Sequence, residues 1–481
     1  MKRLLYAATL SGSLAGLPLA AQNEIDALRY SQITFGGTAR YNAMGGAFVA
    51  VGADFSTFAM NPAGIGLYRR SEFTVTPNFF SRSVSSSYNG TMSEDSRYNM
   101  SFQNFGFVFA GPVDNPREDG WQTAGLAIGY NRQQSFQSNM LMTGTSSTSI
   151  LDAWRESANG YYSDELDGFN EGLAFNTWLL DTLPNDPTFY TDTIPDGTEL
   201  IQRKSVETRG GMGEWNFAFG GNYADKLYIG ASIGVPQVRY EESTVYSETP
   251  VNDTAQNFQY LEHRQSLETR GSGINFKFGF IFRPMDWIRI GGAFHTPTVL
   301  RLSDSYSSGM VAKLGSDNWD ASSPSGSFNY TITTPMRAMG GLAFIVGKQG
   351  MFSVDYEFVD YSDARLRARP QVFSNQNDAI RAKYTAASNI RIGGEWRLLP
   401  ISLRAGFALY GNPYAAGITN EDVRTSISGG IGYRDAEDRF FVDAACVRTM
   451  WSENYYFYEG ANAVKNETGI TNLMLTVGFR Y

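Results

Sequence analysis

Few side chains in this chain could carry out covalent or metal chemistry. Its 481 residues include two histidines, His263 and His295, and one cysteine, Cys446. A nucleophilic serine needs a base such as histidine beside it, and haem or metal binding needs convergent ligands. Nothing in the sequence brings the two histidines together. The sequence therefore predicts no enzyme, no catalytic residue, no metal site and no cofactor, and one cysteine allows no intrachain disulfide.

One glycine-rich stretch, residues 36–68, is the more informative part of the chain. It reads GGTARYNAMGGAFVAVGADFSTFAMNPAGIGLY, which is too apolar for a solvated tail. Its glycines disfavour a long helix or a regular strand, so compact irregular structure is expected. Irregular backbone has unpaired N–H and C=O groups, which surrounding protein must satisfy away from water. The rest of the chain is therefore expected to enclose this stretch.

Two groups of side chains in and beside this stretch are candidates for ligand binding or gating. Asp54 could cap a turn or pair with a lumenal arginine, and the Asn61-Pro62-Ala63 turn could lock the stretch or take part in gating. The second group is aromatic and could either pack the stretch against its enclosure or form the floor of a ligand site. These aromatic residues are Phe35, Phe48, Phe55 and Phe58.

The first residues predict an exported protein. Lys2 and Arg3 precede an apolar run that ends in small residues at Ala20 and Ala21, which is typical of a signal peptide over residues 1–21. The formal net charge of −9 offers no basic face for nucleic acid. After the signal peptide there is no apolar run of the length that a transmembrane helix needs.

The remainder of the chain predicts a transmembrane β-barrel. The last segment, ITNLMLTVGFRY, alternates apolar with polar residues, and similar patterns recur through a chain with 50 glycines and 33 phenylalanines. Short links between the segments alternate with long polar ones, as periplasmic turns and extracellular loops do. The fourteen expected strands are 72–84, 98–110, 121–138, 212–223, 225–245, 258–283, 286–303, 326–347, 349–369, 386–399, 401–412, 423–435, 437–457 and 469–481.

Three further segments are expected at the external end of the barrel. The longest, residues 139–211, has apolar residues at near-helical spacing and predicts one or two amphipathic helices packed on the barrel mouth or on a hydrophobic ligand. Residues 375–388 could hold a short helix. The aromatic run WSENYYFYEG (451–460) fits the interfacial girdle of a barrel, with ligand contact as the alternative.

The pattern GTAR…MGGAFVAVGAD.S…NPAGIGLY resembles the hatch of the FadL/TodX family of outer-membrane transporters for hydrophobic compounds. The resemblance implies a hatch of residues 22–70 inside a fourteen-stranded barrel of residues 71–481. It also implies that external loops capture an amphipathic ligand, which enters an apolar cavity above the plug. A shift of the N-terminal segment then releases the ligand, sideways through a gap in the wall in the best-known member.

The predicted function is therefore passive, plug-gated transport of a hydrophobic or amphipathic small molecule, such as a long-chain fatty acid, across the outer membrane of a Gram-negative cell. Expected partners are that ligand and the lipids and lipopolysaccharide of the membrane, with no nucleic acid. The alternative is an adaptor or shuttle of a protein secretion system, which would bind secretion proteins. Haem uptake is less favoured, because no convergent ligands are evident.

Overall fold

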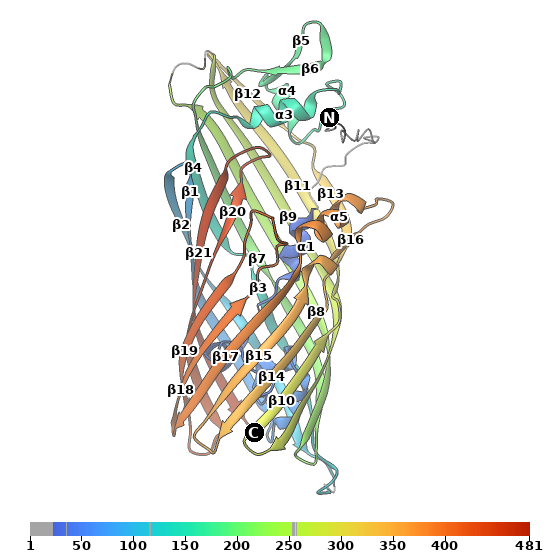
Figure 1. Ribbon diagram of the computed structural model, residues 1–481, viewed down its shortest axis with the longest axis vertical. Coiled ribbons are helices and arrows are strands. Elements are labelled where there is room, and N and C mark those ends of the chain that lie inside the picture. Colours follow the sequence, from blue (N-terminus) through green and yellow to red (C-terminus); the bar gives the residue numbers. More distant parts are fainter. Residues whose placement is uncertain (1–22, 35, 115–116, 253–254, 256) are drawn as a thin grey trace, which may run out of the picture.

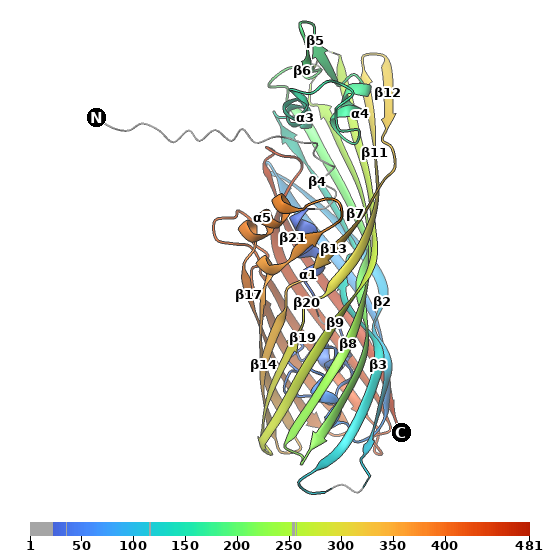
Figure 2. The same ribbon diagram turned by 90° about the vertical axis from the view of Figure 1, so that its right-hand side faces the viewer.

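The computed structural model describes residues 23–481 apart from 35, 115–116, 253–254 and 256. The predicted signal peptide, residues 1–21, and Phe35 lie outside the described residues. In the described part the chain forms one tall barrel that encloses its own N-terminal segment, residues 23–70 (Figures 1 and 2). No helix among the described residues is long and apolar enough to cross a membrane.

The wall is a closed barrel of fourteen antiparallel strands, as the sequence predicted, and β1 pairs with β21 to close it. Two of the fourteen are interrupted where Pro297 and Pro335, which lack an N–H donor, break the ladder. In order, the strands are β1 (Glu72–Tyr88), β2 (Thr91–Pro112), β3 (Trp121–Ser135), β7 (Leu200–Tyr223), β8 (Leu227–Pro250), β9 (Phe258–Met285), β10 (Ile288–His295) with β11 (Val299–Leu314), β13 (Gly326–Thr333) with β14 (Arg337–Val346), β15 (Gly350–Asp360), β17 (Ala386–Leu398), β18 (Ile401–Tyr410), β19 (Arg424–Arg434), β20 (Phe440–Tyr456) and β21 (Ala463–Arg480).

The remaining elements lie inside the barrel or at its loop end. The N-terminal segment contains α1 (Glu24–Ser31), α2 (Ala39–Ala43), η1 (Phe55–Ala59) and η2 (Pro62–Leu67). The loop-end elements are β4 (Ser138–Ser146), α3 (Ile150–Ala158), α4 (Glu171–Asn176), β5 (Leu180–Leu183), β6 (Asp186–Asp192), β12 (Asp317–Ser322), η4 (Tyr361–Asp363), β16 (Arg365–Arg367) and α5 (Ser374–Lys383).

The two faces of the wall differ, because side chains alternate along each strand. Toward the short-turn end, the outward face carries exposed apolar residues on every side, among them Leu126, Phe219, Ile233, Phe278, Leu403 and Leu475. The inward face carries buried polar and charged residues such as Glu214, Lys277, Glu357 and Arg391. An apolar outer band with a polar interior is the arrangement of outer-membrane barrels, and this protein is one of them.

The sequence placed the boundary of the long external segment wrongly. Residues 138–146 form strand β4, which pairs with the upper half of β7 and extends the wall beyond the membrane band. The expected helices of this segment are present as α3 and α4, whereas the β5–β6 hairpin was not anticipated. The apolar spacing of α3 was visible locally, but the pairing of β4 with residues 200–208 joins positions far apart in sequence. The short helix expected in residues 375–388 is α5.

Glycines on the inward face let the N-terminal segment approach the wall. A Cβ atom on Gly393 would clash with the carbonyl oxygen of Met44, and one on Gly230 would clash with the backbone of Pro62. The same holds for Gly291 and the backbone of Val49. Close backbone approach is a common reason for glycine within a strand. The glycines that alternate through the strands therefore provide the seat of the N-terminal segment.

We predict that Gly393→Ala destabilises the protein by about 1–3 kcal/mol, because the added methyl group overpacks a backbone contact. Its neighbour Gly394 is the matched control, since a Cβ atom there would lie 3.6 Å from the nearest atom, the carbonyl oxygen of Met351. Gly394→Ala should change stability by less than about 0.5 kcal/mol. Urea unfolding in lipid vesicles measures both variants, and equal effects would contradict the proposed seat.

Candidate functional site

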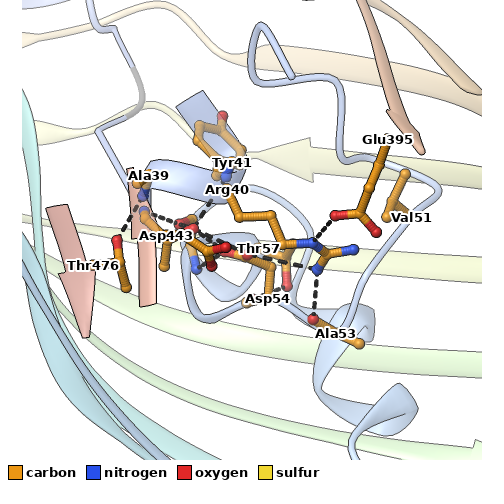
Figure 3. Close-up of polar contacts among 12 residues, drawn as sticks. Ala39, Arg40, Tyr41, Val51, Ala53, Asp54, Thr57, Glu395, Asp443 and Thr476 are labelled. Carbon is orange, nitrogen blue, oxygen red and sulfur yellow. Dashed lines mark hydrogen bonds and ion pairs between the residues drawn. The ribbon is translucent and has the colours of Figure 1, made fainter. Parts of the chain in front are cut away.

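A buried ion-pair network fixes the N-terminal segment to the wall. Arg40 Nε donates to Glu395 of β17 at 2.8 Å, and Arg40 NH1 donates to the Ala53 carbonyl at 3.1 Å (Figure 3). Glu395 also accepts from Arg404 of β18 at 2.7 Å, and Arg404 in turn binds Asp443 of β20 at 2.6 Å. All four charged side chains are buried. Buried charges need such partners, so the network specifies one position of the segment.

Asp54 lies inside the N-terminal segment and organises it. Its Oδ1 accepts from the Ser56 amide at 3.0 Å and from Thr38 Oγ1 at 2.8 Å, so it caps η1. Its Oδ2 lies 3.7 Å from NH1 of Arg40. The sequence left open a cap or an arginine partner; Asp54 makes both contacts, and its arginine belongs to the segment rather than to the wall (Figure 3).

Asn61 joins the segment to the wall directly. Its Nδ2 donates to the Val49 carbonyl at 2.6 Å and to the Phe280 carbonyl of β9 at 3.1 Å. Its Oδ1 accepts from the Ala63 amide at 3.1 Å, which caps η2, and Pro62 begins that helix. The Asn-Pro-Ala turn thus holds two parts of the segment and one wall strand together. A role in gating stays a prediction.

The aromatic candidates are packed between the segment and the wall. Phe48 lies against Tyr41 with ring centroids 5.3 Å apart, and Phe55 meets Phe58 edge to face at 4.6 Å. All three phenylalanines are buried. Among the described residues of the candidate set, none lines the hollow described below. Their contribution to a ligand floor stays a prediction.

A hollow of about 380 Å³ lies between α1, the α2 turn and the wall. The N-terminal segment contributes Leu28, Gln32 and Tyr41 among others, so it forms part of the lining. The wall contributes both apolar and charged residues: Phe80, Arg82, Phe136, Tyr240, Glu242, Arg391, Asp422, Arg424, Val447, Trp451, Glu453 and Met474. The resemblance implied an apolar cavity, whereas this lining is mixed. Such a hollow suits a molecule with an apolar body and a polar group.

Two arginines of the lining, Arg82 and Arg424, lie over the same tryptophan ring but differ in their partners. Arg82 of β1 lies over the ring of Trp451, with its guanidinium carbon 5.1 Å from the ring centroid. Among the described residues its Nε has no hydrogen-bond partner. Arg424, by contrast, lies over the same ring at 4.8 Å but is bound to Asp422 at 2.6 Å. Arg82 is therefore the arginine of the two that can bind an anionic ligand group.

The wall has a gap between β2 and β3 beside this hollow. The two strands form ladder pairs from Asn104 and Asn131 down to the short-turn end. Above that level β3 bulges between Arg132 and Gln134, and within the described residues β2 makes no further ladder pair with it. Higher still, NH1 of Arg97 on β2 reaches Asn139 of β4 at 2.7 Å, which bounds the gap from above.

Two separate hollows adjoin each other at this gap. A second hollow, of about 540 Å³, lies over the gap and the neighbouring strands and is lined by Met100, Gly213 and Arg239 among others. Four residues line both hollows: Phe80, Ser101, Arg132 and Gln137. The N-terminal segment borders the same place, because the amides of Thr34 and Gly36 donate to the carbonyls of Gln133 and Arg132, each at 2.8 Å.

The two histidines lie in separate surroundings. His295 Nε2 is 2.7 Å from the Met60 carbonyl oxygen, which can only accept, so His295 donates and ties β10 to the segment. His263 lies edge to face with Trp154 at 5.1 Å under α3. Ser232, between Gly230 and Gly234, has the spacing of a nucleophile elbow, but it lies in the middle of β8 rather than on a strand-to-helix turn.

Known structures share the fold of this barrel. A FadL homologue from Pseudomonas aeruginosa superposes with a TM-score of 0.56 over 93% of this chain and 99% of its own, at 12% identity. The toluene transporter TodX of Pseudomonas putida gives 0.55 over 94% and 100%, at 14% identity, and the monoaromatic hydrocarbon channel CymD gives 0.51 over 93% and 98%, at 13%. The chain has the FadL-type fold. No protein-family model and no curated protein matches the sequence.

The lining residues of this FadL-type barrel were missed in the sequence for an identifiable reason. For the aromatic run 451–460 the sequence favours an interfacial girdle over ligand contact, but Trp451 and Tyr455 of this run line the inner hollow. The alternation along β20 contained the signal: Cys446 faces outward, so Val447 and Trp451 face inward. Aromatic composition was given more weight than strand parity, and parity was correct.

We predict that Glu395→Gln lowers the free energy of unfolding by about 3–5 kcal/mol, because Arg40 and Arg404 lose their shared carboxylate in a buried site. Glu467→Gln is the matched control, since Glu467 pairs with Lys465 on the outer surface, with 64% of its side chain exposed. The control should cost less than about 1 kcal/mol. Urea unfolding in vesicles would contradict the network if both variants shifted the transition equally.

Proposed function

We propose that this protein transports a hydrophobic or amphipathic small molecule, such as a long-chain fatty acid, across the outer membrane without an energy source. The observation that carries the proposal is that the inner hollow shares four lining residues with the second hollow, which lies over the gap in the wall. The solved neighbours are described as a toluene transporter and a monoaromatic hydrocarbon channel, which is consistent with an apolar cargo. An apolar body gains roughly 0.8 kcal/mol per buried CH₂ when it leaves water.

The mixed lining favours an amphipathic cargo over a pure hydrocarbon. A hydrocarbon could not bind the Nε of Arg82, which has no hydrogen-bond partner among the described residues, and an unpaired polar group is costly in a low-dielectric site. The rim itself is polar, since Ser101, Arg132 and Gln137 line both hollows. A carboxylate or hydroxyl on the cargo can bind these groups while its chain contacts Phe80 and Met474.

The N-terminal segment acts as the hatch in this proposal. It lines the hollow and hydrogen-bonds to β3 beside the gap, so a shift of the segment changes both at once. Because Thr34 and Gly36 bind the bulged part of β3, release of these two hydrogen bonds frees the edge of the gap. The cargo then leaves sideways into the bilayer, down its own gradient.

We predict that Ser101→Trp slows delivery of the cargo, because an indole at this shared position fills the place where the two hollows meet. Ser305→Trp, on the outward face of β11 away from the gap, is the matched control. Proteoliposomes and a fluorescent long-chain fatty acid measure transfer, and S101W should reduce the rate about tenfold or more while S305W leaves it unchanged. An undiminished rate in S101W would exclude this exit route.

We also predict that a cross-link between Thr34→Cys and Gln133→Cys, in a Cys446→Ser background, stops transport when oxidised. The cross-link fixes the segment to β3 at the gap, and a reductant should restore transfer. Thr34→Cys alone, treated with the same oxidant, controls for damage. Equal transfer before and after reduction of a verified cross-link would show that the segment does not move during transport.

The same assays separate the transport proposal from the alternative functions. A protein that binds secretion subunits stably and transfers no fatty acid would instead fit a secretion adaptor. Haem uptake would require a spectral change when haemin is added to the purified barrel, and the separate surroundings of His263 and His295 give no support for one.

A further inference from the structure

The outer surface carries a layer of arginines directly above the apolar band. Five neighbouring strands, β3, β7, β8, β9 and β11, each place an outward arginine just above this band: Arg132, Arg209, Arg239, Arg270 and Arg301. Arg203 on β7 and Arg264 on β9 also face outward, farther from the band. Below them on the same faces lie apolar residues such as Ile233 and Ile274. The β8–β9 ladder has no pairs at Val235 and Pro236, but the offset between the strands is the same at Ile233 and at Arg239, so the arginines face the same side as the apolar band.

Glutamates form a second layer one position farther from the membrane band. Glu241 lies beyond Arg239 on β8 and binds it at 2.6 Å, and Glu268 lies beyond Arg270 on β9 and binds it. Glu207 stands in the same relation to Arg209 on β7, at 2.8 Å. Arginine is always nearer to the apolar band, although β7 and β9 run opposite to β8.

Between β8 and β9 this layering places like charges side by side, whereas on the other edge of β8 Arg209 lies opposite Glu241. Arg239 lies directly opposite Arg270, and Glu241 lies directly opposite Glu268. Like charges directly opposite in a sheet are destabilising. Exchanging arginine and glutamate on one strand would convert both pairs into opposite charges at no change in composition. The arrangement therefore costs the sheet stability, which calls for an anion outside the protein at the level of the arginines.

We propose that this arginine layer binds the phosphate groups of the outer-leaflet glycolipid, lipopolysaccharide. Phosphates of membrane lipids lie where the apolar band ends, which is the level of the layer. Arginine binds phosphate through paired N–H donors. Arg239 and Arg270 are each 61% exposed and so are available to a lipid headgroup.

Two further arginines make the layer net cationic. Among the described residues, neither Arg132 nor Arg301 forms a salt bridge with a carboxylate. They flank the paired arginines on the two outer strands of the group. In this proposal the glutamates, which lie farther from the apolar band than the arginines, face the sugars of the lipopolysaccharide rather than its phosphates. This proposal concerns the outer wall and does not depend on what the barrel transports.

The test inverts the layering without changing composition. One variant exchanges the two layers on both β8 and β9. On β8 it carries Arg239→Glu and Glu241→Arg, and on β9 it carries Glu268→Arg and Arg270→Glu. Native mass spectrometry of the full-length barrel in detergent, titrated with bisphosphorylated lipid A, measures binding. We expect the wild type to bind lipid A specifically, and the variant to bind about tenfold more weakly or worse.

The control variant exchanges Lys465 and Glu467, an exposed pair on β21 outside the layer, and should bind like the wild type. Arg301→Gln is a milder second variant, which should weaken binding even if the fourfold exchange fails to fold. Dephosphorylated lipid A should lose specific binding, and phosphatidylglycerol should bind more weakly than lipid A. Equal binding by both lipids, by dephosphorylated lipid A or by the inverted variant would overturn the proposal.

Discussion

The satisfaction of irregular backbone away from water is the constraint on which this structure depends. The N-terminal segment has too many glycines to pair its own N–H and C=O groups in regular elements, so the wall must provide partners. On the wall, Asp355 accepts from the Val49 amide and His295 donates to the Met60 carbonyl. On the segment, Asn61 donates to a backbone carbonyl of the wall. The backbone of the segment can approach the strands closely because many inward positions of the strands are glycine.

The same constraint explains the charged interior. A segment held by hydrogen bonds and ion pairs requires polar wall residues at its level, and these continue upward into the lining of the hollow. Arg40 and Glu395 fix the segment below, while Arg82 and Arg424 face the hollow above it. The seat of the segment and the inner hollow are thus parts of one polar interior. Because β3 bulges where Thr34 and Gly36 bind it, this interior also reaches the gap in the wall.

The outer face follows a different rule. There the type of residue follows its position along the membrane normal, from hydrocarbon to phosphate to water, rather than the charge of its cross-strand neighbour. Apolar residues, arginines and glutamates follow one another in that order on β8 and β9, even where the cross-strand neighbours repel. Arg239 and Arg270 also border the outer hollow at the gap, so a cargo that leaves sideways emerges beside this cationic layer.

The sequence by itself determined the class of fold and the enclosed segment. Strand alternation and link lengths are local properties, so the fourteen strands could be recognised one at a time, and the glycine-rich stretch required an enclosure. The hollow, the gap and the arginine layer could not be found in this way. They depend on which residues of distant strands lie opposite one another, such as β4 with β7 or Arg239 with Arg270, and only the closed barrel sets that register.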